Sequence, residues 1–192
     1  KCQGTYCHVL NSERTCAAAQ SADTVPLLMA FNATLSFVAS GGAATLPIRD
    51  LYTNDGRLHR VHTLPKGAMV TSVRIPALSP NLRSTYIKIR QRSSIDYAQL
   101  AIGLTGLFEN GVVSELQGVF GALMPKPKRV LFPEAEGQAL TDALIEQLAD
   151  ISWKKCRPQT SIVGGTEWRR EMVRVHTKRG LLALRDNHKI LE

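Results

Sequence analysis

Two apolar runs joined by Asn110-Gly111 place the strongest limit on how this chain can fold. The first run spans Tyr97 to Phe108, and the second spans Val112 to Phe120. An Asn-Gly pair between such runs is typical of a hairpin, because both residues tolerate the positive φ angles that a two-residue loop requires. The sequence therefore predicts a long antiparallel hairpin in the C-terminal part of the chain.

The residues upstream of this hairpin predict further strands, because apolar and polar side chains alternate in them and turn residues bound them. The predicted strands are Thr34 to Ser40, Ala44 to Ile48, Met69 to Ile75 and Thr85 to Arg92. Prolines punctuate the stretch from Pro76 to Asn81, so we expect a domain boundary there. The expected domains are residues 1–77 and 78–192.

Three segments have the spacing or the end signals of helices, and an irregular stretch with three prolines precedes the second of them. The predicted helices are Ser21 to Ala33, Thr141 to Trp153 and about Thr166 to Arg185, and the prolines are Pro125, Pro127 and Pro133. In the first helix, Ser21 or Asp23 is the expected N-cap and Pro26 lies in the first turn. The fold class is α+β, an antiparallel sheet with a helical cluster.

The last predicted helix has an apolar side and a basic side. The apolar side comprises Trp168, Met172, Val175 and Leu182. The basic side comprises Arg169, Arg170, Arg174, Lys178 and Arg185. Such a basic face is usually just solvated, and docking to a partner protein is the alternative.

The sequence contains no candidate membrane span, and its charge pattern gives no support for nucleic-acid binding. No run of about 18 or more apolar residues occurs, which is what a transmembrane helix requires. The formal net charge is +8 and the pI is near 9.6, values that suit a nucleic acid, an acidic protein or an anionic cofactor. Basic and aromatic residues are not interleaved as in single-strand binders, so we expect no nucleic-acid partner.

Three of the four cysteines lie close together at Cys2, Cys7 and Cys16, and Cys156 stands apart. A secreted disulfide framework is denser than this, so we expect a reducing, cytoplasmic compartment and treat the three thiols as candidate metal ligands. The first residues include neither a Met nor the apolar core of a signal peptide. We therefore expect that the chain begins inside a longer polypeptide.

Seven strings of this sequence resemble the FAD-binding medium subunit of the molybdenum hydroxylase or xanthine dehydrogenase family, which includes the carbon monoxide dehydrogenase flavoprotein and, as the nearest branch, the β subunit of 4-hydroxybenzoyl-CoA reductase. They occur in the family's order and at about its spacing. The strings are CHVLNSERTC (7–16), SADTVPLLMAFNA (21–33), LYTNDG (51–56), VTSVRIP (70–76), YIKIRQRSSIDYAQLAIGL (86–104), PKPKR (125–129) and EWRREM (167–172).

The resemblance implies the second half of a PCMH-type FAD-binding domain (residues 1–77) and a domain like the C-terminal domain of CO dehydrogenase flavoprotein (residues 78–192). In that family the loops that grip the FAD pyrophosphate lie in the first half, so this chain would form one wall of the flavin site. It would pass electrons through FAD between [2Fe–2S] clusters and an external acceptor. The implied partners are a large subunit with molybdopterin and a small subunit with the [2Fe–2S] clusters, in a dimer of heterotrimers.

The resemblance also assigns residues to FAD. Asp23 matches an acidic residue that hydrogen-bonds FAD, with Ser21 and Thr24 in the same string. Lys88 matches a lysine near the isoalloxazine ring, where a cation raises the flavin potential. Val70 matches an apolar residue that packs on the ring. The alternatives are a helix N-cap for Asp23, a surface lysine for Lys88 and ordinary core for Val70.

The clustered cysteines resemble those of the reductase branch, where a loop in this region carries a [4Fe–4S] cluster. Four thiolates are normally needed, so beside Cys2, Cys7 and Cys16 the fourth ligand would precede residue 1. The alternatives are cysteines without a metal and a zinc site that includes His8.

Other interpretations stay open at this point. The chain could be a non-catalytic assembly module that has lost flavin, because the first half of the flavin domain is absent. Gly164-Gly165-Thr166-Glu167 resembles the family's phosphate loop, but it lies at the start of the last predicted helix, so we interpret it as a helix start. Arg90 and Arg92 with Asp96 indicate a structural or interface ion-pair group. The substrate and the electron acceptor are chosen in other polypeptides.

Overall fold

The computed structural model describes residues 19–53, 62–93, 95–159 and 165–188. Within these ranges the strands form two antiparallel sheets, which together with the helices confirms the α+β class. The smaller sheet has the order β2-β1-β3, with β1 at Thr34–Ala39, β2 at Gly42–Pro47 and β3 at Met69–Arg74. The larger sheet has the order β4-β5-β6-β7, with β4 at Leu82–Ile89, β5 at Leu100–Glu109, β6 at Val112–Gly121 and β7 at Lys128–Leu131.

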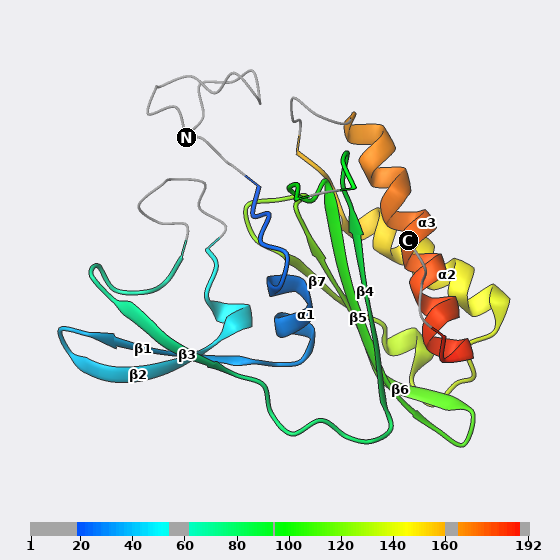
Figure 1. Ribbon diagram of the computed structural model, residues 1–192. Coiled ribbons are helices and arrows are strands. Elements are labelled where there is room, and N and C mark those ends of the chain that lie inside the picture. Colours follow the sequence, from blue (N-terminus) through cyan, green and yellow to red (C-terminus); the bar gives the residue numbers. More distant parts are fainter. Residues whose placement is uncertain (1–18, 54–61, 94, 160–164, 189–192) are drawn as a thin grey trace.

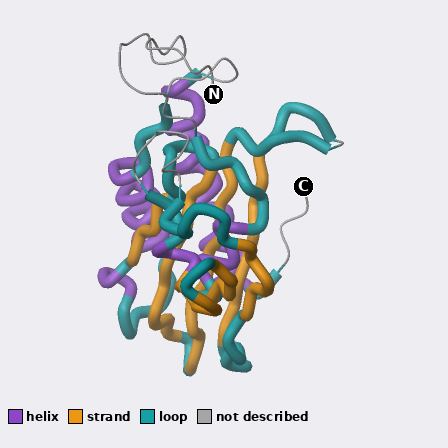
Figure 2. Tube along the Cα trace, turned by 90° about the vertical axis from the view of Figure 1, so that its left-hand side faces the viewer, coloured by secondary structure: helices purple, strands orange, loops and turns teal. Residues whose placement is uncertain are grey.

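The helices divide the molecule into layers. The α-helices are α1 at Val25–Ala30, α2 at Asp142–Lys155 and α3 at Thr166–Asp186, and the short 3₁₀ turns are η1 at Ile48–Asp50 and η3 at Pro133–Ala135. Figure 1 shows α1 between the two sheets, with α2 and α3 on the opposite face of the larger sheet. In the view of Figure 2, from the side of the smaller sheet, the long strands run side by side. Among the helices that the structure describes, none has the length and apolar content needed to cross a membrane.

The predicted central hairpin is confirmed as β5 and β6. Glu109 pairs with Val112, and the turn residues Asn110 and Gly111 have φ angles of 51° and 82°. Left-handed backbone at both positions is what a two-residue hairpin turn of this type requires. The first strand of the hairpin begins at Leu100, not at Tyr97 as predicted.

The two faces of β5 contact different helices, because alternate residues of a strand point to opposite faces. Leu100, Ile102 and Leu104 are fully buried in a cluster that includes residues of α2 and α3. Gly103, on the other face, lies against the backbone of Leu27 in α1. The larger sheet is therefore the middle layer, with a helix or helices on each face.

A second buried cluster connects the two sheets. It contains Val25 and Met29 of α1, Leu35 and Phe37 of β1, and Val119 of β6. Because α1 contributes to a core that both sheets share, the apolar interior is continuous across the position where the sequence predicts a domain boundary.

The first predicted helix is wrong in its extent and its N-cap. The predicted helix covers residues 21–33, whereas α1 has six residues and its N-cap is Thr24. The Thr24 side chain makes no capping hydrogen bond. The predicted caps were Ser21 and Asp23, but the Asp23 carboxylate binds Lys88 of β4 instead. Pro26 lies in the first turn, as predicted.

The stretch after the hairpin is not wholly irregular, since it contains β7. This strand begins at Lys128, directly after Pro127, and it pairs only with β6 at the edge of the sheet. A proline just outside an edge strand removes no hydrogen bond from the ladder, so the prolines bound this strand without preventing it.

The residues that α3 buries are not those of the predicted apolar side. Trp168 was assigned to that side, but it is 44% exposed. The buried line runs instead through Arg169, Val173, Thr177 and Leu181, each four residues after the last. A search for apolar residues alone misses this line, because two of its four members are polar.

Arg169 joins three parts of the chain although it was assigned to the basic face. It is 3% exposed; Nη1 donates to the Ala122 carbonyl at 3.2 Å, and Nη2 donates to the Gln159 carbonyl. Burial lowers the pKa of the guanidinium. The side chain thereby links the start of α3 to the end of β6 and to the connection that follows α2.

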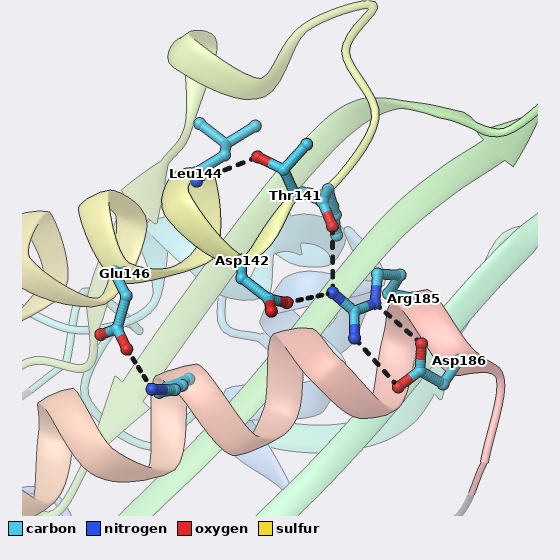
Figure 3. Close-up of polar contacts among 8 residues, drawn as sticks. Thr141, Asp142, Leu144, Glu146, Arg185 and Asp186 are labelled. Carbon is cyan, nitrogen blue, oxygen red and sulfur yellow. Dashed lines mark hydrogen bonds and ion pairs between the residues drawn. The ribbon is translucent and has the colours of Figure 1, made fainter.

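Other basic residues of α3 pair with acidic residues, as Figure 3 shows. Arg185 Nη1 lies 2.6 Å from Asp142 Oδ1 of α2, and its Nε lies 2.8 Å from Asp186 Oδ1. Lys178 pairs with Glu146 of α2. These positive charges are thus partly neutralised inside the chain, which weakens the interpretation of the basic side as a docking surface.

We expect Arg169→Met to lower the free energy of unfolding by about 2 kcal/mol, because the Ala122 and Gln159 carbonyls would lose their donor inside the protein. Denaturant unfolding measures this change. Arg179→Met is the matched control on the same helix, and its exposed side chain predicts a change within about 0.5 kcal/mol. Equal effects of the two substitutions would contradict the structural role of Arg169.

The Arg185 ion pairs predict an acid dependence of stability. The hydrogen bond from Arg185 is the main cause that lowers the pKa of Asp186. A carboxyl with a lowered folded pKa stabilises the protein above its unfolded pKa of about 3.9, and this contribution is lost as pH falls through the folded value. From about pH 6 to about pH 3, the Tm should therefore fall less in Arg185→Met than in the wild type. Arg179→Met should keep the wild-type slope.

Candidate functional site

Asp23 and Lys88, the two charged residues assigned to the flavin, form an ion pair. Lys88 Nζ lies 2.7 Å from Asp23 Oδ2. The Lys88 side chain is 13% exposed and that of Asp23 is 51% exposed. The pair joins the segment before α1 to strand β4, which are 65 residues apart in sequence at these positions.

The position of Lys88 in β4 explains why it reaches Asp23. Neighbouring residues of a strand point to opposite faces, and Ile87 is buried in the cluster with α2 and α3. Lys88 therefore points to the face that α1 covers. Its partner in register is Ala101 of β5, whose small side chain is buried in this face. This arrangement agrees with the alternation of apolar and polar residues from which the strand Thr85 to Arg92 was predicted.

Main-chain hydrogen bonds hold the segment before α1 against the larger sheet. The Gln20 amide donates to the Met124 carbonyl at 2.9 Å, and the Ala122 amide donates to the Gln20 carbonyl at 2.7 Å. Gln20 Nε2 also donates to the Tyr52 hydroxyl at 3.3 Å. Burial raises the pKa of Tyr52, against the opposite effect of this hydrogen bond. No sequence pattern marked Gln20, because main-chain bonds leave no signature in residue type.

Gln117 holds the other end of α1. Its Nε2 donates to the Ala30 carbonyl at 3.0 Å, and its Oε1 accepts from Arg129 Nε at 2.7 Å. The last carbonyls of a helix lack partners within the helix, so this buried amide satisfies one of them. Burial and the nearby charge of Arg49 lower the pKa of Arg129. Sequence reasoning also missed Gln117, because no pattern distinguishes it from Ser114 and Glu115, the other polar residues of the same strand.

The other residues assigned to the flavin do not all gather at this pair. Ser21 and Thr24 lie on the same segment as Asp23, Ser21 partly buried and Thr24 exposed. Val70 is 47% exposed and lies in β3, where it pairs with Phe37 of β1. It therefore belongs to the smaller sheet, whereas Lys88 belongs to the larger one.

Asp96 organises the connection between β4 and β5. Its Oδ2 lies 3.5 Å from Arg92 Nε and accepts from the Arg92 amide at 3.2 Å, while Oδ1 accepts from the Tyr97 amide at 2.8 Å. Loss of solvent raises the pKa of Asp96, but the hydrogen bonds from Arg92 and Tyr97 outweigh this effect and lower it. The predicted ion pair of Arg92 and Asp96 is confirmed.

The described part of the chain contains no group of three or more His, Cys, Asp or Glu residues arranged to hold a metal ion. The candidate ligands Cys2, Cys7 and Cys16, and the neighbouring His8, lie outside the described residues. Cys156 is fully buried, and burial raises the pKa of its thiol to about 12. Because a thiolate is the metal-binding form, Cys156 is a poor ligand.

Two family matches divide the chain in sequence order. Residues 14–78 match the FAD binding domain in molybdopterin dehydrogenase. Residues 85–184, more than half of the chain, match the CO dehydrogenase flavoprotein C-terminal domain.

Known relatives agree with these matches. The medium chain of glyceraldehyde dehydrogenase from Sulfolobus acidocaldarius is 25% identical over 163 residues, which cover 82% of this chain and 54% of the relative. Carbon monoxide dehydrogenase from Hydrogenophaga pseudoflava, in a form that lacks the Mo-pyranopterin moiety, matches with a TM-score of 0.76 and 21% identity over 84% of this chain and 55% of its own. Quinoline 2-oxidoreductase from Pseudomonas putida 86 gives a TM-score of 0.74 and 18% identity, over 88% and 58% of the two chains.

The low identity of the two solved structures makes them evidence for the fold alone. This chain spans somewhat more than half the length of the relatives it matches. The extent of the C-terminal match, together with the flavin-domain match before it, shows that the chain belongs to the FAD-binding medium subunits of the molybdenum hydroxylase family.

Proposed function

We propose that this chain forms one wall of an FAD site in an electron-transfer subunit of an oxidoreductase. The observation that carries this proposal is the ion pair between Asp23 and Lys88. Asp23 lies in the segment that matches the FAD binding domain, and Lys88 lies in the segment that matches the flavoprotein C-terminal domain. The ion pair therefore joins one charged residue from each of the two segments that match a family domain.

The side chains around the pair suit a bound flavin. Asp23 is half exposed, so its carboxylate can accept hydrogen bonds from hydroxyl or N–H groups of FAD. The Thr24 hydroxyl is not used as a helix cap, and Ser21 is partly exposed nearby. These three residues would hold polar parts of FAD. Val70 would supply an apolar contact from the smaller sheet.

FAD, when bound, supplies the exchange between two-electron and one-electron carriers. The positive charge of Lys88 would favour the added negative charge of a reduced flavin. Asp23 opposes this effect, since two opposite charges 2.7 Å apart produce a weaker field at a distance than one charge alone. The pair would therefore set the flavin potential, and this chain would carry out no substrate chemistry of its own.

The proposal includes the partners of the flavin. Electrons would pass between this subunit and a small subunit with [2Fe–2S] clusters, while a large subunit would hold molybdopterin and the substrate. The relative named as a medium chain supports the view that this chain is one subunit of a larger enzyme. We also propose a cytoplasmic dimer of heterotrimers, in which the flavin lies close enough to a cluster for electron transfer.

Substitution of the two charges should shift the flavin midpoint potential in opposite directions. In the protein with its complete natural sequence, Lys88→Met should lower the potential by roughly 30 mV, the equivalent of about 1.4 kcal/mol for two electrons. Asp23→Asn keeps the side-chain shape and removes the opposing charge, so the potential should rise. Spectroelectrochemical titration of the bound FAD measures both shifts.

Arg179→Met is the control for the potential measurement, because it removes a positive charge from an exposed site on α3. It should leave the potential unchanged. Shifts of the same sign in Lys88→Met and Asp23→Asn would rule out the proposed field of the pair. A wild-type protein that is purified without bound FAD would rule out the flavin site itself.

The cysteine cluster is proposed on the resemblance alone. If Cys2, Cys7 and Cys16 hold a [4Fe–4S] cluster, the anaerobically purified complex should contain more iron than its [2Fe–2S] clusters require. Cys16→Ser should remove this additional iron, while Cys156→Ser should retain it. An iron content that the partner subunits fully explain would exclude the additional cluster.

A further inference from the structure

The backbone of α1 lies unusually close to strand β5. A Cβ built on Gly103 would lie 3.0 Å from Leu27 Cα, 3.0 Å from Leu27 N and 3.0 Å from Pro26 C. All three atoms belong to the helix backbone, so no side-chain rotation could relieve the contact. The absence of a side chain at Gly103 therefore permits α1 to lie this close to the larger sheet.

A second glycine contacts α1 in a different way. A Cβ on Gly121, at the end of β6, would lie 2.9 Å from Pro26 Cγ. This contact involves a side-chain atom, which a substitution at Pro26 can remove. Substitution at Pro26 can therefore relieve the contact at Gly121 but not the contact at Gly103, which distinguishes the two glycines.

Hydrogen bonds fix the segment on both sides of this close contact. The Gln20 main chain bonds to Ala122 and Met124 before α1, and the Gln117 side chain bonds to the Ala30 carbonyl at its end. Asp23 lies between these anchors, before the N-cap Thr24. The separation of Asp23 from Lys88 thus depends on the depth at which α1 packs on the sheet.

We propose that Gly103 is a positioning residue that sets the depth of α1 and thereby holds Asp23 against Lys88. The proposal deepens the flavin function above and rests on it for its effect on FAD. A methyl group at position 103 would push the helix backbone away from β5. The 2.7 Å contact between Asp23 and Lys88 would then open, and the polar groups that precede α1 would move relative to the cofactor.

Amide hydrogen exchange tests the depth of α1 without any need for FAD. In Gly103→Ala, local exchange of the Gln20 amide should become roughly tenfold faster, because its bond to the Met124 carbonyl depends on the packed segment. Gly118→Ala is the matched control: its Cβ would meet Leu104 Cδ2 at 2.8 Å on the opposite face of the same sheet. That variant should lose overall stability but keep the local protection of Gln20.

Flavin binding tests the consequence of this position. In the protein with its complete natural sequence, Gly103→Ala should raise the dissociation constant for FAD roughly tenfold. In a protein that also carries Asp23→Asn, most of this increase should disappear. Gly118→Ala should bind FAD as the wild type does. Fluorescence titration of the apoprotein with FAD gives these constants.

Suppression by a second substitution distinguishes the two glycines. Gly121→Ala should also lose Gln20 protection and FAD affinity, because its Cβ would press on Pro26 Cγ. Adding Pro26→Ala removes that Cγ atom and should restore both properties. It should not restore Gly103→Ala, whose contacts are with backbone atoms. Restoration of both variants would overturn the depth-setting role of Gly103.

The remaining outcomes separate this proposal from the flavin function. Unchanged Gln20 exchange in Gly103→Ala would overturn the positioning role, whatever the flavin does. Faster exchange with wild-type FAD affinity would overturn the link between the helix and the cofactor. A wild-type protein that binds no FAD would refute the proposed function, while the exchange data would still decide whether Gly103 sets the position of α1.

Discussion

The close contact between α1 and the larger sheet is the constraint on which the rest of the arrangement depends. A helix of six residues is too short to be stable alone in water, so α1 must obtain its stability from packing. Gly103 allows its backbone to lie directly on β5, and the apolar side chains of α1 then bury against both sheets. One short helix thereby joins the two sheets into a single body, and the residues that precede it are held at the edge strand β4.

Ala122, directly after β6, is hydrogen-bonded both to the segment before α1 and to α3. Ala122 has a φ of 65°, a left-handed conformation that is costly for a residue with a Cβ. Its amide donates to Gln20 before α1, and its carbonyl accepts from Arg169 of α3. These bonds from the two faces of the sheet hold the backbone in this conformation. A disturbance at either helix would therefore reach the other through a single residue, Ala122, although α1 and α3 lie on opposite faces.

The sequence predicts the parts of this fold that local patterns determine. The Asn110-Gly111 turn and the alternation in β4 are local, and the structure contains both the predicted hairpin and a strand at β4. The buried line of α3 could not be predicted from apolar spacing, because Arg169 is satisfied by distant carbonyls that no local pattern reveals. Gln20 was missed because it acts mainly through its main chain. The resemblance assigned Asp23 and Lys88 each to FAD, but it did not predict their ion pair, since nothing local to either residue brings them together.

The magnitudes indicate that the packing of α1 maintains the ion pair, and not the reverse. An ion pair with one half-exposed partner contributes about 1 kcal/mol or less to stability, because water screens the charges. Burial of an apolar side chain such as Val25 or Met29 contributes roughly 1.5–3 kcal/mol each. Asp23 and Lys88 are therefore held in contact by a structure that does not depend on their attraction. Since the fold does not need the pair, their charges are free to serve a bound cofactor, and either one can be exchanged without loss of the packing that places the other.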